Sequence, residues 1–173
     1  MKKFLIFIMF ISTTTNIFSQ NDDIKNVYYA FLQNKGKCNS TIINYILKES
    51  SVNGSASYNF IKNLYPNIDS TTINNFKASE KINLSFISCP SIKRTLPEDE
   101  IKSNLKKLRK EYSKDYLRIL ELSSIGFNDK RNQAILTYYE EGESYLSAEG
   151  YFVILEKVDD TWSITSMINS IVY

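Results

Sequence analysis

A run of acidic and tyrosine side chains in the C-terminal third of the chain could do chemistry. Two carboxylates on either side of a sugar can hydrolyse a glycosidic bond, and the same groups could hold a cation weakly. A hydrated acidic loop explains the same residues, and we favour that explanation. The acidic candidates are Glu140, Glu141, Glu143 and Glu149, in a segment that also holds Tyr138, Tyr139 and Tyr145.

Aromatic side chains of the same region could instead line a binding pocket. Tyrosine suits a partly wet surface, because its ring is apolar and its hydroxyl is polar. Packing in the core and on the sheet is the alternative explanation, and we favour it over a binding surface. If there is a ligand pocket, we expect its lining to include Tyr138, Tyr139, Tyr151 and Trp162.

The chain contains no histidine. That excludes Ser-His-Asp and Cys-His catalysis as usually built, and most catalytic zinc sites. Neither of the glycine-rich phosphate-binding motifs G-x-x-x-x-G-K-S/T and G-x-G-x-x-G occurs in the sequence. The Asp-Asp pairs lack the spacing of a calcium-binding EF-hand loop. We therefore expect no cofactor and no metal. We favour a non-enzymatic domain that binds a small ligand or a protein over a histidine-free hydrolase.

Residues 1–19 have the pattern of an export signal. Lys2 and Lys3 precede the unbroken apolar run Phe4–Ile11, and Ser19 is a small residue before the expected cleavage point. The apolar run is shorter than the roughly 20 residues that span a bilayer, and no second long run follows. We predict a leader over 1–19, then a single exported α+β domain over 20–173, in the periplasm or outside the cell, with no integral membrane segment.

Two cysteines follow the leader, Cys38 and Cys89. In an oxidising compartment such a pair tends to form a disulfide. Two free, partly buried thiols are the alternative, and the sequence leaves both open.

The formal net charge is +2 for 173 residues and falls near zero once the leader is removed. This balance is unlike that of a nucleic-acid-binding protein, so we expect no nucleic-acid partner. The length is that of one domain with a real core.

Helical signals dominate the first two thirds of the mature chain. An apolar stripe with helical spacing predicts a helix over Asp22–Asn34, and Gly36 is its stop signal. Periodicity does not decide between helix and strand for the block Ile42–Leu47. We expect a short helix over Ala56–Tyr65 and another that begins at Asp69 or Ser70.

Two further elements are expected before the C-terminal third. Alternation of apolar and polar residues predicts a strand over Ile82–Phe86 and its neighbour Ile87. Thr95 and Glu98 match a capping box, which predicts the start of a helix with Ile101 on its apolar seam.

The residue pattern of the C-terminal third predicts a meander of four strands. A turn follows the first strand, over 126–130, and a polar loop follows the second, over 140–148. A hairpin joins the third strand to the fourth. The strands are expected over Leu117–Ile125, Gln133–Tyr139, Gly150–Lys157 and Trp162–Val172.

Helices first and antiparallel strands last is the α+β pattern. We predict N-terminal helices packed on one face of a C-terminal antiparallel sheet of about four strands. The preferred architecture is a curved sheet wrapped over a long helix, as in nuclear-transport-factor-2-like or cystatin-like folds.

The C-terminal third also carries a loose residue pattern. Ser123, Gly126, Phe127 and Asn128 are followed by Gln133-Ala134, by the run 150–157 and by Trp162-Ser163-Ile164. This resembles the pattern S-x-x-G-F-N, Q-A, G-x-Y-x-x-L-x-K and W-x-I of uncharacterised secreted bacterial proteins, with phenylalanine here at the tyrosine position. The resemblance implies export and a shared sheet. Some of those proteins carry a cysteine pair between the second and third strands, which this chain lacks.

Overall fold

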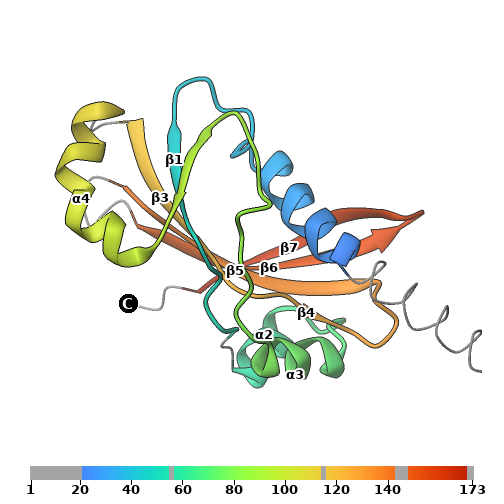
Figure 1. Ribbon diagram of the computed structural model, residues 1–173. Coiled ribbons are helices and arrows are strands. Elements are labelled where there is room, and N and C mark those ends of the chain that lie inside the picture. Colours follow the sequence, from blue (N-terminus) through green and yellow to red (C-terminus); the bar gives the residue numbers. More distant parts are fainter. Residues whose placement is uncertain (1–20, 55–56, 114–115, 143–147, 171–173) are drawn as a thin grey trace, which may run out of the picture.

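A computed structural model describes residues 21–54, 57–113, 116–142 and 148–170. The expected leader and Glu143 lie outside these ranges. The described residues form an α+β fold around one mixed sheet of seven strands (Figure 1). The strand order is β2-β1-β3-β5-β6-β7, and β4 pairs with β5 beside this path. The strands are β1 (Asn44–Lys48), β2 (Ile92–Leu96), β3 (Leu117–Leu122), β4 (Gly126–Phe127), β5 (Gln133–Glu141), β6 (Glu149–Val158) and β7 (Thr161–Asn169).

The expected antiparallel meander is confirmed for β3, β5, β6 and β7. Several boundaries differ from the prediction. β3 ends at Leu122 instead of Ile125, and β7 ends at Asn169, while the predicted end at Val172 lies outside the described residues. Gly126 and Phe127 form β4 instead of a turn, because they pair with Ile135 and Ala134. The segment predicted as a loop over 140–148 begins later, because Glu140 and the residue after it still pair with β3.

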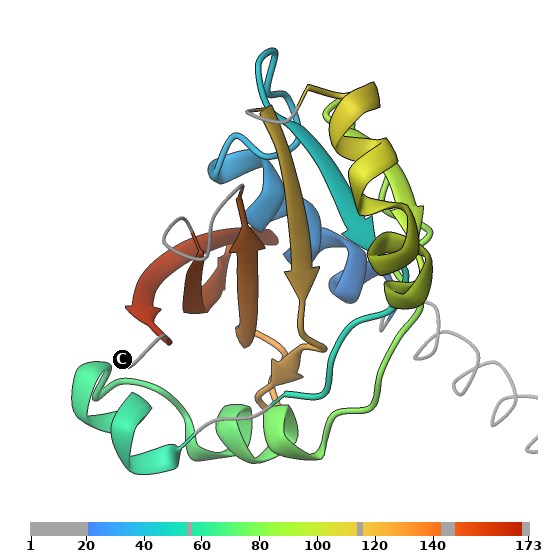
Figure 2. The same ribbon diagram turned by 90° about the vertical axis from the view of Figure 1, so that its left-hand side faces the viewer.

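The prediction of about four antiparallel strands is wrong for the sheet as a whole. β1 lies between β2 and β3 and is parallel to both, so the described sheet is larger and mixed (Figure 2). The undecided block Ile42–Leu47 supplies β1. Neighbouring strands in parallel pairs come from distant parts of the chain. A local sequence pattern therefore does not predict which strands pair with β1.

Helices cover both faces of the sheet, and the prediction of one covered face is wrong. The expected first helix is present over residues 21–34 and packs on one face. The opposite face carries α2 (Tyr58–Leu64) and α3 (Ser70–Ala78) at one end and α4 (Glu98–Glu111) over β1 and β3. Figures 1 and 2 show these helices on the two sides of the sheet.

The two-residue period of the strands explains why both faces need cover. On β5, Leu136 and Tyr138 pack with the N-terminal helix, whereas Ile135 packs with α2 and α3. On β6, Val153 packs on the face of the N-terminal helix, and Ile154 packs on the face of α2 and α3. Strands that are apolar on both faces must be buried on both faces.

Two local predictions between the helices and the meander are wrong. Residues 82–87 do not form a strand, and Asn83 makes only an isolated bridge to Ser50. A turn buries the apolar side chains there, because the Ile87 amide bonds to the Leu84 carbonyl. The Thr95 capping box is also absent, because Thr95 belongs to β2 and α4 starts after Pro97 without a side-chain cap. The helix expected to begin at Asp69 or Ser70 is confirmed as α3. It begins at Ser70, and Asp69 caps it, since the Asp69 side chain accepts the Thr71 amide.

Gly126 permits the close approach of α3 to the sheet. A Cβ atom at Gly126 would lie 2.4 Å from the backbone nitrogen of Phe76, and one at Gly54 would lie 2.2 Å from the Phe76 carbonyl oxygen. Two glycines therefore hold one aromatic residue of α3 between them. Asn128, also in the residue pattern noted above, accepts the amides of Asn132 and Gln133 and so closes the β4–β5 turn.

Cys38 and Cys89 form a disulfide, which decides the alternative that the sequence left open. It joins the segment after the N-terminal helix to the segment before β2. Among the helices that the structure describes, none has the length and apolar character needed to cross a membrane.

Candidate ligand-binding groove

Four of the predicted site residues come together on the face that carries the N-terminal helix. Strand register places Tyr138 opposite Tyr151 and Glu140 opposite Glu149 on β5 and β6. Opposite residues of antiparallel strands point to the same face. The rings of Tyr138 and Tyr151 stack with centroids 5.5 Å apart.

A lysine that sequence reasoning did not select completes this cluster. Lys37 follows the N-terminal helix and forms an ion pair with Glu140, and the exposed fractions of the two side chains are 11% and 6%. The lysine ammonium also lies 5.5 Å from the ring centroid of Tyr45 and 5.9 Å from that of Tyr138. The buried charge of Glu140 therefore has a buried partner of opposite sign.

Burial and charge act in opposite directions on Lys37. Burial alone would lower the pKa of its ammonium, but the hydrogen bond and the charge of Glu140 outweigh burial and raise that pKa. Burial also raises the pKa of the Tyr138 phenol, with a further contribution from the carboxylates of Glu149 and Glu140. At neutral pH the lysine is thus cationic and the phenol is protonated.

This cluster is packed, and its rings do not form an open cavity wall. Tyr138 is 2% exposed, and Glu140 is engaged by Lys37. The other two candidates from the same stretch lie elsewhere, because Tyr139 and Glu141 alternate with their neighbours and point to the opposite face. The last aromatic candidate, Trp162, lies at the far end of the sheet.

Trp162 borders a pocket of about 590 Å³ between the N-terminal helix and the β6–β7 hairpin. We call it the helix–hairpin groove. The helix contributes side chains at i, i+3, i+4, i+7 and i+8, which lie on one helical face. The hairpin contributes its second turn residue and the first two residues of β7. The lining is Asn26, Tyr29, Ala30, Gln33, Asn34, Asp160, Thr161 and Trp162.

The indole nitrogen of Trp162 has no hydrogen-bond partner. Within the described residues it is the one buried side-chain nitrogen or oxygen atom in this condition. Buried polar groups are nearly always hydrogen-bonded, so an exception needs an explanation. The ring itself is held firmly, since Phe127 meets it edge-on at 5.7 Å between centroids and Lys157 lies 6.0 Å from its centre.

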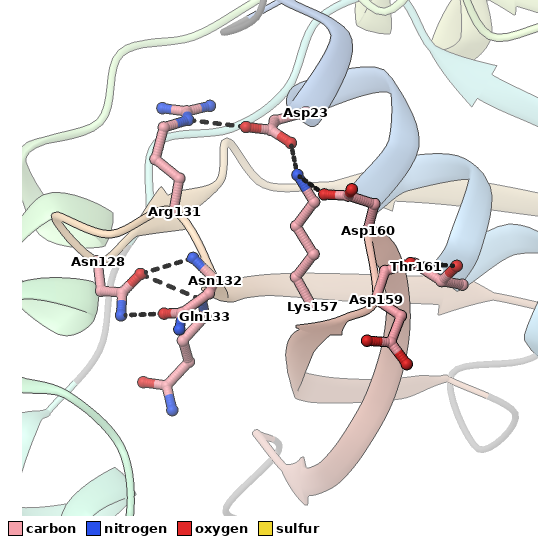
Figure 3. Close-up of polar contacts among 9 residues, drawn as sticks. All are labelled: Asp23, Asn128, Arg131, Asn132, Gln133, Lys157, Asp159, Asp160 and Thr161. Carbon is pink, nitrogen blue, oxygen red and sulfur yellow. Dashed lines mark hydrogen bonds and ion pairs between the residues drawn. The ribbon is translucent and has the colours of Figure 1, made fainter.

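A charged network fixes the helix to the hairpin at one end of the groove (Figure 3). Buried Asp23 of the helix accepts from Arg131 at 3.0 Å and from Lys157 at 3.1 Å. Lys157 also lies 3.6 Å from Asp160. Burial would raise the pKa of the Asp23 carboxyl, but the bonds from the two cations outweigh it and lower that pKa. The carboxylate thus stays charged at neutral pH and sets the spacing between helix and hairpin.

The turn at the rim of the groove has an unusual backbone. Asp159 and Asp160 have φ values of 48° and 60°. Positive φ at both central residues suits a two-residue hairpin, in which Asn-Gly or Asp-Gly is the usual choice. The sequence places aspartate at both positions, and this projects an exposed carboxylate beside the groove.

The groove lining offers amides, the hydroxyls of Tyr29 and Thr161, aromatic surface and a single charged group, the carboxylate of Asp160. Because no lining residue is cationic, the groove suits an uncharged polar ligand better than an anion. Sequence reasoning selected Trp162 but missed Asn26, Gln33 and Asn34. Their signal is an uncharged polar stripe that runs beside the apolar stripe of the same helix.

A second pocket, of about 350 Å³, lies beside the same hairpin and includes Gln133 and Glu156. The buried side-chain amide of Gln133 already has hydrogen-bond partners for both its oxygen and its nitrogen. The oxygen of Gln133 accepts from the Asp69 amide and the Thr72 hydroxyl, and its nitrogen donates to Asn67 and Glu156. This network ties α3 to the sheet and leaves no group of Gln133 for a ligand.

Among the described residues, no group of three or more Asp, Glu, Cys or His side chains is arranged to hold a metal ion. No protein-family model, curated protein or solved structure shows significant similarity to this chain.

Proposed function

We propose that this protein is an exported, non-enzymatic domain that binds a small uncharged polar ligand in the helix–hairpin groove. The observation that carries the proposal is that Trp162, which borders the groove, has a buried indole N–H without a hydrogen-bond partner. Leaving such a donor unsatisfied costs about 1–3 kcal/mol. A ligand oxygen that accepts from it recovers that energy on binding.

The size and chemistry of the groove support this function. Its volume of about 590 Å³ falls in the range of small-molecule sites. Hydroxyl and carbonyl groups of a neutral ligand match the amides of Asn26, Gln33 and Asn34. The Trp162 nitrogen has no solvent contact, so side chains of the wall must move before a ligand reaches it.

Export rests on the leader pattern over residues 1–19 and is compatible with the Cys38–Cys89 disulfide. The proposed architecture remains a nuclear-transport-factor-2-like or cystatin-like fold. The N-terminal helix against one face of a large sheet supports it, and the parallel strands β1 and β2 are an addition to it.

The test uses the only tryptophan of the chain, Trp162. Protein purified from its own host is titrated with neutral mono- and disaccharides and with uncharged dipeptide amides, and its tryptophan fluorescence is recorded. A saturable spectral shift is expected with at least one probe. Asn26→Ala should weaken that binding about tenfold, the loss of one hydrogen bond. Asn63→Ala, the same change on the exposed face of α2, should leave it unchanged.

Two results would contradict the binding proposal. One is a flat titration with every probe, together with native mass spectrometry that finds no small molecule retained on the protein from its host. The other is release of free sugar from the disaccharides, which would favour the histidine-free hydrolase. That alternative uses Glu140, Glu141, Glu143 or Glu149 as reacting groups, and Glu140 is already engaged by Lys37.

A further inference from the structure

The strands at the two ends of the strand order, β2 and β7, differ in how their edges are protected. β2 is five residues long and carries Lys93 and Arg94. β7 is nine residues long and holds neither a charged residue nor a proline. Soluble proteins usually shield an edge strand with charge, proline, a bulge or short length. β7 has only a bulge, at Thr165, where the register with β6 shifts.

Strand register shows which backbone groups of β7 are unused by β6. The Ser170 amide bonds to the Gly150 carbonyl, so bonded positions alternate from there back along the strand. The N–H and C=O of Met167 therefore point away from the sheet. At the other end, Val158 and Thr161 close the two-residue hairpin, which directs the backbone groups of Ile164 outward.

Exposed side chains on this edge are also compatible with a close neighbour. Ser163 and Thr165 are exposed, small and neutral. The bulge at Thr165 increases the local twist of β7. Backbone groups that can pair with another strand remain on both sides of the bulge, at Ile164 and Met167.

We propose that two copies of this chain pair through their β7 strands and form one continuous sheet. A two-fold axis brings identical edges together in antiparallel orientation. Antiparallel pairing of strands is slightly more stable per residue than parallel pairing. Like charges placed opposite one another destabilise such pairs. An edge without charge can meet its own copy without that penalty, and it offers no charge with which to select a different, charged partner.

The experiment compares Ser163→Lys with Ser103→Lys. Both change an exposed serine to lysine, one on β7 and one on the outer face of α4. Molar mass is measured by light scattering over a range of concentrations, with circular dichroism to check folding. The unmodified protein and Ser103→Lys should be dimers. Ser163→Lys should raise the dimer dissociation constant about tenfold, because each dimer gains two lysines at the shared edge.

Hydrogen exchange gives a second readout that needs no variant. The amides of Ile164 and Met167 should become protected as concentration rises, while exposed amides of α4 do not change. A monomer at every concentration would overturn the proposal, as would a dimer that forms without protection of β7. Protection that appears only when a host extract is added would assign the edge to a strand of another protein. None of these readouts depends on the helix–hairpin groove, so the two proposals can fail separately.

Discussion

Lys37 and Glu140 form an ion pair that is nearly closed to solvent, although the two residues are 103 positions apart in the chain. The pair joins the end of the N-terminal helix to the C-terminal part of β5. Two charges removed from water are tolerated because each neutralises the other.

Removing one member of this pair should be costly. Lys37→Met leaves the Glu140 carboxylate buried without a partner, and we expect it to lower the free energy of unfolding by about 3–5 kcal/mol. Urea denaturation measures the change. Lys102→Met, which breaks the exposed pair with Glu98, should leave the midpoint unaltered. The double variant Lys37→Met/Glu140→Leu should recover most of the loss, and a double variant as unstable as Lys37→Met would refute this account.

Asp23 should make stability depend on acid. Its folded pKa is lowered, so below the ordinary aspartate pKa the unfolded chain binds a proton before the folded one does. Stability from this group is therefore complete at neutral pH and is lost as pH falls through the folded pKa. Asp23→Asn should be less stable than the unmodified protein at pH 7, and the difference should shrink as the pH falls well below 4. Urea midpoints across that range test this, and a constant difference would count against it.

Gly126 should tolerate no side chain. Gly126→Ala places a Cβ against the backbone of Phe76, so α3 must move away from the sheet. We expect a loss of about 3 kcal/mol, the upper end for overpacked cores. Gly36→Ala is the matched control, because φ there is +65° but nothing lies within 4 Å of the added atom. It should cost about 1 kcal/mol. A loss of less than about 1 kcal/mol for Gly126→Ala would show that the contact with Phe76 is unimportant.

Reduction of the disulfide should weaken the fold without changing its architecture. Cys38 and Cys89 are separated by 51 positions, and closing a loop of that length restricts the unfolded chain by about 4 kcal/mol in the chain-entropy model. The Cys38→Ser/Cys89→Ser variant should lose that amount in urea unfolding and become insensitive to reductant. Unmodified protein in urea without a reductant should show no reactive thiol, because both cysteines are bonded. A thiol that reacts under those conditions would contradict the bond.

Strong local periodicity allowed the sequence to predict part of the fold. Patterns of ten residues or so predict the helix over 21–34, the start of α3 at Ser70 and the pairing of β5, β6 and β7. β2 was missed because Lys93 and Arg94 interrupt its apolar character. The apolar residues of 82–87 are buried by a turn instead of a strand, since burial alone does not specify backbone shape.

The candidate site was only partly accessible from sequence. Trp162 was selected as an aromatic residue, and its place in a groove comes from the helix packed beside it. Tyr138 was selected on the same grounds and lies in the core. Amides such as Asn26 and Gln33 form only a stripe of uncharged polar residues on the helix, which is a weak signal because exposed helix positions often carry them. The partner of Glu140 is Lys37, and only the fold brings those two residues together.

The position of β1 has a consequence for how the molecule is assembled during synthesis. Both strands that border β1 come later in the chain, and β3 ends only at Leu122. A growing polypeptide that has emerged as far as Lys48 therefore holds an unpaired strand whose neighbours do not yet exist. Distant pairings of this kind form slowly. The part of the sheet around β1 therefore cannot be completed until Leu122 has been synthesised, and the N-terminal segment lacks these strand partners during most of translation.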